Sequence, residues 1–437
     1  MKLSLSLVAG AAAATLVMMG GTKGAPGVAN TFVATTLAAA ASEAEFCVMP
    51  PDSQNAQGPL DTRNYDQRDG DTTPIRMVFD PYPSFNGVAI DPANNLVLFS
   101  DTNRKSLMLF RRNEGGRGQA ATQPIRQIMG PDTGVGFAAG VALDPEHREL
   151  MTVNNDVEDR MVVFDYDDHG NVKPKRLLYV PHQSWGISLS KKRDQIVFSV
   201  QTPNMIIWYK RDAKGLEPPL RVVRGGKTRM GDPHGVAVDD VHDEVLVANH
   251  GNWRPQELIT SYPAYDTRES RQETNPSQRV TEGMRGRFLL GSITVFPADA
   301  SGDVAPTRTI SGPLTELDWP MGITVDPKNQ EMAVANNGDN SVLVFRRTDD
   351  GNAAPLRAIR GPRTGIKSPM GVQIQGDELW VANFGDHTAL VFPRTATGNV
   401  APTRIIRNAP AGTPTTGVGN PYAVAYDSKR GQLLVPN

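Results

Sequence analysis

The chain has 437 residues and a formal net charge of -2 at pH 7, with basic and acidic residues mixed along its length. This balance lacks the basic footprint of a nucleic-acid-binding protein or of a protein held on an anionic membrane, so we expect neither partner. Gly (41) and Pro (34) are abundant. Such a composition favours many short strands joined by turns over long helices.

Residues 1–45 are predicted to form a signal peptide and a low-complexity leader. Lys2 supplies a positive charge, residues 3–19 supply an apolar stretch, and Ala29 and Ala44 lie at candidate cleavage sites. A membrane anchor is the alternative, but the Ala and Gly content makes a weak spanning helix. We expect export to the periplasm or the extracellular space, with no membrane span after cleavage. The single Cys47 excludes an intramolecular disulfide, so the core must supply the stability.

A Pro-x-Arg motif followed by apolar residues recurs along the chain. Successive arginines are 45 to 50 residues apart, except for one interval of 87. A period of this size indicates one supersecondary unit repeated in space. The seven motif arginines are Arg76, Arg126, Arg176, Arg221, Arg308, Arg357 and Arg404.

Each unit contains four short runs of alternating apolar residues, separated by turn residues, as in "GITV", "MAVANN", "SVLVF" and the Pro-x-Arg segment after Gly322. This pattern predicts a four-stranded antiparallel sheet. A small residue opens every unit, namely Gly87, Gly140, Gly186, Gly235, Gly322, Gly371 and Ala423. Sheets repeated at this period usually stack radially, so residues 46–437 are predicted to form an all-β, seven-bladed β-propeller.

The predicted ring is closed by strands from both ends of the chain. The last unit reaches Asn437 after two strands, and "TTPIRMVF" at residues 72–79 would supply its outer strand. Proline cannot donate to a ladder, so the Pro-x-Arg motif marks the edge strand of each blade. The arginine is predicted to discourage pairing between the edges of two molecules.

The arrangement "VAVD", "VLVAN" and "ITVF" in the unit of Gly235 resembles NHL-type and YVTN-type bacterial β-propellers. The resemblance covers about residues 60 to 437. It implies the fold but only weakly a function, because related propellers serve as lactonases, lyases, binding modules and scaffolds.

Three histidines are expected on the top face, where the loops enter each first strand and join the second strand to the third. His234 and His250 belong to one unit, and antiparallel pairing makes them neighbours. His182 enters from the preceding unit. The trio either holds a divalent metal with an open position, or forms a hydrogen-bonded rim; the dispersed spacing favours the rim.

A polar residue ends the second strand of six units: Asp101, Asn155, Asn249, Asn336, Asn383 and Asn437. Their oxygens could face the axis and bind a cation or a polar ligand. Alternatively, each side chain bonds the turn of its own unit, which the recurrence favours.

The interval of 87 residues contains an insertion, residues 253–290, in the fourth blade. A long irregular segment on a loop face is predicted to be a lid or a binding loop. Aromatic residues nearby act either as wedges between blades or as a binding patch. The predicted ligand-binding residues are His182, Trp185, His234, Asn249, His250, Trp253 and Trp319.

Two functions of different class remain. The chain is predicted to be an exported binding or scaffold protein that presents its top face to a small ligand or a protein partner. The alternative is a metal-assisted lactonase or lyase acting in the top-face cavity. The sequence leaves open the cofactor, the metal, the ligand and the oligomeric state.

Overall fold

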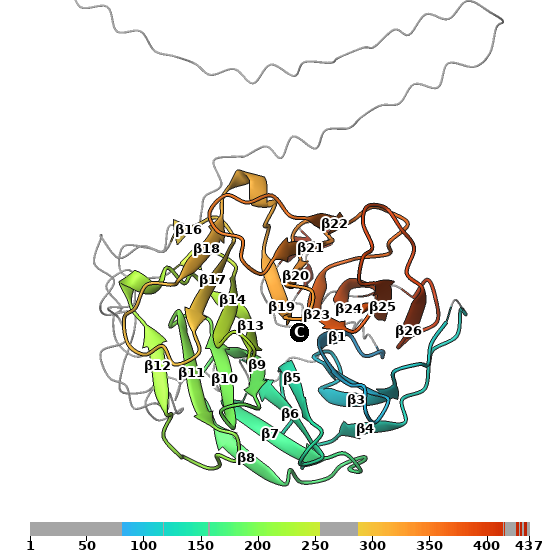
Figure 1. Ribbon diagram of the computed structural model, residues 1–437. Helices are drawn as coiled ribbons and strands as arrows, with labels where there is room; N and C mark the ends of the chain where they lie inside the picture. The colour runs from blue at the N-terminus through green and yellow to red at the C-terminus, as the bar shows by residue number, and fades with distance from the viewer. Residues whose placement is uncertain are drawn as a thin grey trace, which may run out of the picture. The chain divides into compact units, whose positions relative to one another are not determined.

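The computed structural model describes residues 81–437, apart from 117, 156–157, 254–286, 414, 416–424, 428, 431 and 435–437. Within them, six four-stranded antiparallel sheets surround a common centre as the blades of a β-propeller (Figure 1). In each blade the strands follow one another from the centre outward. The predicted blade architecture is therefore confirmed.

The first three blades contain β1 Phe85–Asp91, β2 Leu96–Asp101, β3 Ser106–Arg111 and β4 Arg126–Met129; β5 Ala138–Asp144, β6 Glu149–Asn154, β7 Arg160–Asp165 and β8 Arg176–Tyr179; and β9 Ser184–Ser190, β10 Gln195–Val200, β11 Met205–Lys210 and β12 Arg221–Arg224. The last three contain β13 Pro233–Asp239, β14 Glu244–Asn249, β17 Ser292–Pro297 and β18 Arg308–Ser311; β19 Pro320–Asp326, β20 Glu331–Asn336, β21 Ser341–Arg346 and β22 Arg357–Ile359; and β23 Pro369–Gln375, β24 Glu378–Asn383, β25 Thr388–Pro393 and β26 Arg404–Arg407. Two small ladders pair β15 Asn252–Trp253 with β16 Arg287–Phe288, and β27 Ala425–Asp427 with β28 Gln432–Leu434. Single 3-10 turns are η2 Gly226–Thr228, η5 Pro313–Thr315 and η6 Phe384–Asp386.

The prediction of seven blades is wrong, because the ring of described residues closes with six. The strands β27 and β28 form a separate two-stranded sheet that joins none of the six blades. The segment expected to close a seventh blade, residues 72–79, lies outside the described residues. Closure by strands from both ends of the chain is therefore replaced by direct contact between the sixth blade and the first.

A glycine in each innermost strand explains how closely the blades approach. A Cβ atom at any of the six would lie 2.7 Å or less from a backbone carbonyl oxygen of the next blade, so only glycine fits without a shift. The series ends where Gly371 of the sixth blade meets the Asn86 carbonyl of the first. The seventh sequence unit has Ala423 at this position.

The seam between the sixth blade and the first is stabilised by contacts at several distances from the centre of the ring. Phe85 and Phe99 pack with Trp380 in one buried apolar cluster. Farther out, the backbones of Gly116 and Ile405 exchange hydrogen bonds of 3.0 and 3.2 Å. These contacts join residues almost 300 positions apart in the chain, as a closed ring requires.

On the top face of the same seam, the buried His387 lies with its Nδ1 2.7 Å from the Pro83 carbonyl oxygen. Near the bottom face, Arg112 donates to Glu378 at 2.7 Å. The seam therefore combines apolar packing with polar contacts on both sides of it.

The Pro-x-Arg arginines begin the outermost strand of all six blades, so the edge-strand prediction is confirmed for the motifs from Arg126 onward. Their side chains also form hydrogen bonds near the borders between blades. Arg308 makes two hydrogen bonds with Glu244 at the start of β14, and Arg347 of the next blade donates a third to the same carboxylate. Glu331 and Glu378 are clamped in the same way by one arginine from each of two adjacent blades. The motif therefore links neighbouring blades.

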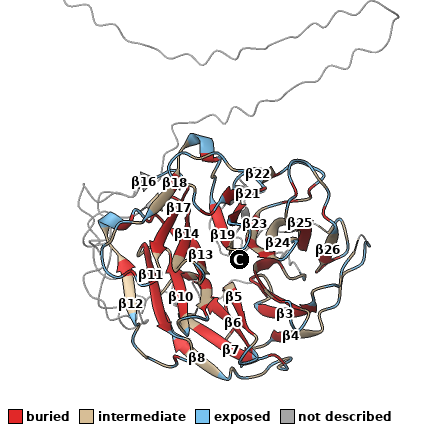
Figure 2. Cartoon of the chain, in the orientation of Figure 1, coloured by how far each residue is buried: buried red, intermediate tan, exposed pale blue. Residues whose placement is uncertain are grey.

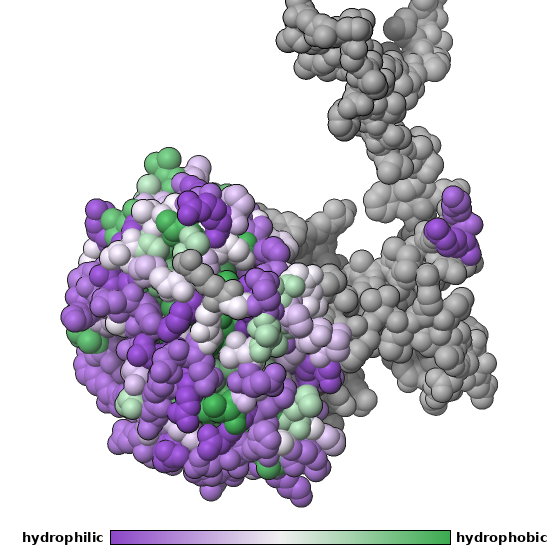
Figure 3. Space-filling model, turned by 90° about the vertical axis from the view of Figure 1, so that its right-hand side faces the viewer, coloured by the Kyte–Doolittle hydropathy of each residue, from purple (hydrophilic) through white to green (hydrophobic). Residues whose placement is uncertain are grey.

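The three inner strands of each blade are largely buried, whereas the outermost strand is intermediate in exposure (Figure 2). The face seen in Figure 3 is mostly hydrophilic, with apolar side chains as isolated spots. In the described part of the chain, no helix is long and apolar enough to span a bilayer.

Candidate functional site

The top face is built from two positions that recur in successive blades. The first is the residue that directly follows the second strand of a blade. Its side chain reaches the start of the innermost strand of the next blade. Asn155 donates to the carbonyl of Ser184, and Asn337 donates to that of Pro369. Gln201 and His250 occupy the same position in the third and fourth blades. His250 is thus one of a set of contacts between blades, and its neighbours decide its chemistry.

The second position is the residue just before the innermost strand. It has a left-handed backbone in four blades, with φ of 64° at Gln183, 55° at Asp232, 49° at Trp319 and 45° at Ser368. Polar residues tolerate this conformation moderately, but it is unusual for a bulky side chain. Trp319 is also 53% exposed. The fifth blade therefore holds a large aromatic ring on a strained backbone and leaves more than half of its surface exposed.

Together these positions assemble a row of five rings across the second to fifth blades. Ring centroids are 5.9 Å apart for Phe137 and Trp185, 4.8 Å for Trp185 and His234, 3.7 Å for His234 and His250, and 5.2 Å for His250 and Trp319. We call these five residues the aromatic row. Its His234 member is buried, whereas its Trp319 end faces solvent.

The hydrogen bonds of His234 define its tautomer. Its Nδ1 lies 3.0 Å from the Asp232 carbonyl oxygen, which can only accept, so Nδ1 carries the proton. Its Nε2 then accepts from the Gln201 amide at 2.5 Å. Burial, followed by repulsion from His250, lowers the pKa of His234 to about 3. This imidazole is therefore neutral at physiological pH.

Asp232, His234 and His250 are the described residues best placed to hold a metal, with ligand atoms within 4.8 Å of one another. The Asp232 carboxylate lies 3.7 Å from the Nδ1 of each histidine. Tetrahedral zinc needs ligand atoms about 3.4 Å apart. The Nδ1 of His234 carries the proton that it donates to the Asp232 carbonyl, so this atom could bind a metal only after that hydrogen bond is broken.

The sequence placed His234 and His250 in contact, and the structure brings them together. The third predicted member, His182, is not part of this cluster. Its Nδ1 lies 2.9 Å from Asp159 at the start of the third strand of the second blade. Asp232 takes the place expected for His182. It stands two residues before His234, and only its left-handed backbone turns the carboxylate back to both rings.

The polar residues that end the second strands act within their own blades. Asn383 accepts from the backbone N–H of Lys367 and donates to the carbonyl of Gly365, both in the loop that enters β23. Asn336 bonds the corresponding loop of its own blade in the same way. These bonds stay within the blade, but they reach the loop 16 to 20 residues earlier in the chain, so they are not the bonds to the residue's own turn that the sequence predicted.

The strand register replaces one predicted member of this set by its neighbour in the sequence. Two other members are described separately. In the second blade the equivalent residue is Asn154, because it pairs with Ala138 and its oxygen accepts from Gly136; Asn155 is one position too far. Asn249 is fully buried, and its oxygen accepts from the backbone N–H of Gly231. Asn437 lies outside the described residues.

The insertion leaves and re-enters the fourth blade through the short ladder of β15 and β16. The side chain of Trp253 and residues 254–286 lie outside the described part of the chain, so the lid remains a prediction. The returning segment exposes Leu289 and Leu290. It then packs beside the start of the fifth blade, because a Cβ on Gly291 would lie 2.9 Å from Pro320.

Comparison with known proteins adds no family to these observations. No protein-family description matches the sequence, and no curated protein matches it. The resemblance to NHL-type repeats is therefore not confirmed. Among solved structures, the chain is similar to a chain of a nidogen/laminin complex, with a TM-score of 0.42 and 12% identity over 75% of this chain and 95% of that one. A likeness at this level carries no argument about function.

Proposed function

We propose that this protein is a binding protein that docks a ligand or a protein partner on its top face, at the exposed end of the aromatic row. The observation that carries the proposal is Trp319. A left-handed backbone costs roughly 1–2 kcal/mol for an ordinary residue, and here it holds a tryptophan of which 53% remains exposed to solvent. Strain of this kind clusters at functional sites, where an interaction with another molecule maintains it.

The surroundings of Trp319 suit recognition. The ring system of Trp319 packs on the His250 ring, and this contact fixes the position of the tryptophan. The exposed Leu289 and Leu290 come from the segment that packs beside Pro320, the next residue in the chain. Rigid aromatic anchors with apolar neighbours and polar residues around them are typical of interaction hot spots.

The N-terminal segment supports export as part of this proposal. A positive residue followed by an apolar stretch and small residues is the pattern of a secretory signal. Detection of the protein in the periplasm or the medium, with a new N-terminus near Ala29 or Ala44, would test it. Retention of the full N-terminus in the cytoplasm would contradict it.

The test of the binding site separates function from stability at one residue. Trp319→Gly removes the ring and relieves the backbone, so the melting temperature should stay the same or rise. A photo-crosslinking amino acid at position 319 should capture a discrete partner, and an excess of the wild-type protein should compete, whereas excess Trp319→Gly should not. The same crosslinker at Val241, an exposed apolar residue in a turn on the bottom face, is the matched control.

Identical capture from both positions would refute the binding site. So would a large loss of stability in Trp319→Gly, because the tryptophan would then serve the fold.

The cluster of Asp232, His234 and His250 supports a second candidate, a metal-assisted lactonase or lyase. Zinc titration distinguishes the two functions. A stoichiometric site that is lost in Asp232→Asn and His250→Ala, and retained in His182→Ala, would favour the enzyme. The hydrogen-bonded Nδ1 of His234 favours the binding protein.

A further inference from the structure

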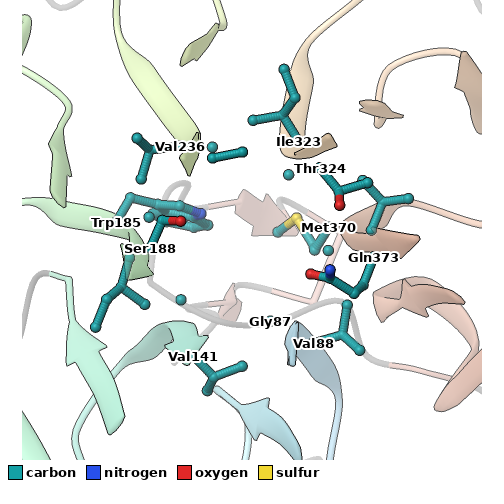
Figure 4. Close-up of a pocket in the computed structure, with 18 of the residues that line it drawn as sticks. Gly87, Val88, Val141, Trp185, Ser188, Val236, Ile323, Thr324, Met370 and Gln373 are labelled. Atoms are coloured by element: carbon teal, nitrogen blue, oxygen red, sulfur yellow. The ribbon is translucent and has the colours of Figure 1, made fainter. Parts of the chain in front are cut away.

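A cavity of about 170 Å³ lies at the centre of the ring and is lined by the innermost strands of all six blades (Figure 4). Each of these strands pairs on its outer side alone, so its inner edge presents backbone N–H and C=O groups to the cavity. The side chains of Ser188, Thr324 and Gln373 add hydroxyl and amide groups to a wall of glycine and aliphatic residues. The wall is therefore polar without being charged.

One donor in this wall is unsatisfied. Asn86 is 2% exposed, and its Nδ2 has no hydrogen-bond partner among the described residues. A buried amide N–H left without an acceptor destabilises the folded protein. Asn86 belongs to the lining of the cavity, but its Nδ2 atom is itself buried, so an acceptor bound in the cavity would take this hydrogen bond after the amide turns towards it.

Trp185 borders the cavity on one side. It comes from the third blade but packs against the apolar cluster of the fifth and sixth blades, so its ring crosses the channel. Figure 4 shows it extending towards Met370. The same ring stacks on His234 in the aromatic row. A molecule bound in the cavity would therefore contact Trp185, and the NMR signal of the Trp185 indole would report the binding.

The lining determines the class of the ligand. None of the described residues that line the cavity carries a charge, and burying an unpaired ion in such a place is costly. The volume corresponds to about six water molecules of the bulk liquid. We propose that the central channel binds a small uncharged molecule rich in hydrogen-bonding groups, such as a polyol. This site is separate from the docking surface at Trp319 and does not depend on it.

The experiment uses the full chain labelled with ¹⁵N at its tryptophan indoles and titrated with erythritol, a neutral four-carbon polyol. Trp185→Phe and Trp319→Phe assign two of the five indole signals. The Trp185 signal should move saturably, with a Kd on the order of 1 mM for so small a ligand, while the Trp319 signal stays in place. Erythronate, the charged acid of similar size, should bind at least about tenfold more weakly, because its charge has no partner.

Asn86→Ala should weaken erythritol binding by about threefold to tenfold, the usual value of one hydrogen bond. Asn113→Ala, which removes an exposed amide outside the cavity, is the matched control and should change nothing. Ser188→Leu, which fills the cavity, should abolish the shift, and it tests the site even if Asn86→Ala does not fold. The proposal is overturned if the Trp185 signal does not move, if all five signals move alike, or if erythronate binds as tightly as erythritol.

Discussion

The contact between Arg112 and Glu378 offers a direct test of closure, because it exists only if the first and sixth blades are neighbours. The arginine nitrogen lies 2.7 Å from the carboxylate, and the two side chains are 29% and 27% exposed. Exposed ion pairs contribute 0.2–1 kcal/mol, and good geometry with partial burial places this one near the top of that range. We expect a coupling free energy of about 1 kcal/mol.

The measurement is a double-mutant cycle with Arg112→Ala, Glu378→Ala and the double variant, each unfolded in urea. Glu378 also accepts from Arg404 and from the Trp380 indole, so the single variant loses more than the pair. The cycle removes these shared losses and leaves the coupling. The urea midpoints are compared at one common slope of unfolding free energy against urea concentration, which avoids the error of extrapolating to zero urea.

The matched control is the cycle of Arg394 and Glu331, which has the same 2.7 Å contact between the fifth and sixth blades. Its coupling does not depend on how the ring closes. A seventh blade between the sixth and the first would separate Arg112 from Glu378 and reduce their coupling to zero, while the control would keep its value. That combination would refute closure with six blades.

Three further predictions concern the fold. Deleting residues 416–437 should leave the melting temperature unchanged, because the described strands in that segment join no blade; insolubility would contradict this. Gly235→Ala should cost about 3 kcal/mol of unfolding free energy through the clash with the next blade, whereas Gly226→Ala, whose Cβ would meet nothing within 4 Å, should be nearly neutral. Burial raises the pKa of the Asp101 carboxyl to about 7, although four hydrogen-bond donors act to lower it. Because the folded protein then binds this proton more tightly than the unfolded chain, the unfolding free energy should fall as pH rises from about 4 to 7. Asp101→Asn should lack this component, and parallel pH profiles for the two proteins would exclude it.

Much of the fold follows from the sequence alone. The alternation of apolar residues and the period of the Pro-x-Arg motif specify four-stranded blades, because strand pleating and edge exposure are local properties. Strand pairing also predicts that His234 and His250 lie close together, since each histidine is one residue away from the pair of Pro233 and Asn249. These inferences need no knowledge of how the blades are arranged.

The number of blades in the ring is decided by packing between units. The glycine that opens six units meets a carbonyl of the next blade, and Ala423 replaces it in the seventh. The sequence contains this difference, but a periodicity count treats both as small residues. Only the close approach of the backbones shows that a Cβ atom at any of the six glycines would meet the next blade.

The candidate site likewise depends on tertiary structure. Asp232 and Trp319 occupy the same left-handed position in adjacent blades, each directly before a Pro-x-Gly segment, but their φ angles are seen only in the structure. Trp185 joins His234 only because the innermost strands of neighbouring blades lie side by side. Contacts within a blade follow from local pairing, whereas contacts between blades depend on the angle and depth at which whole sheets pack, which the order of residues does not reveal.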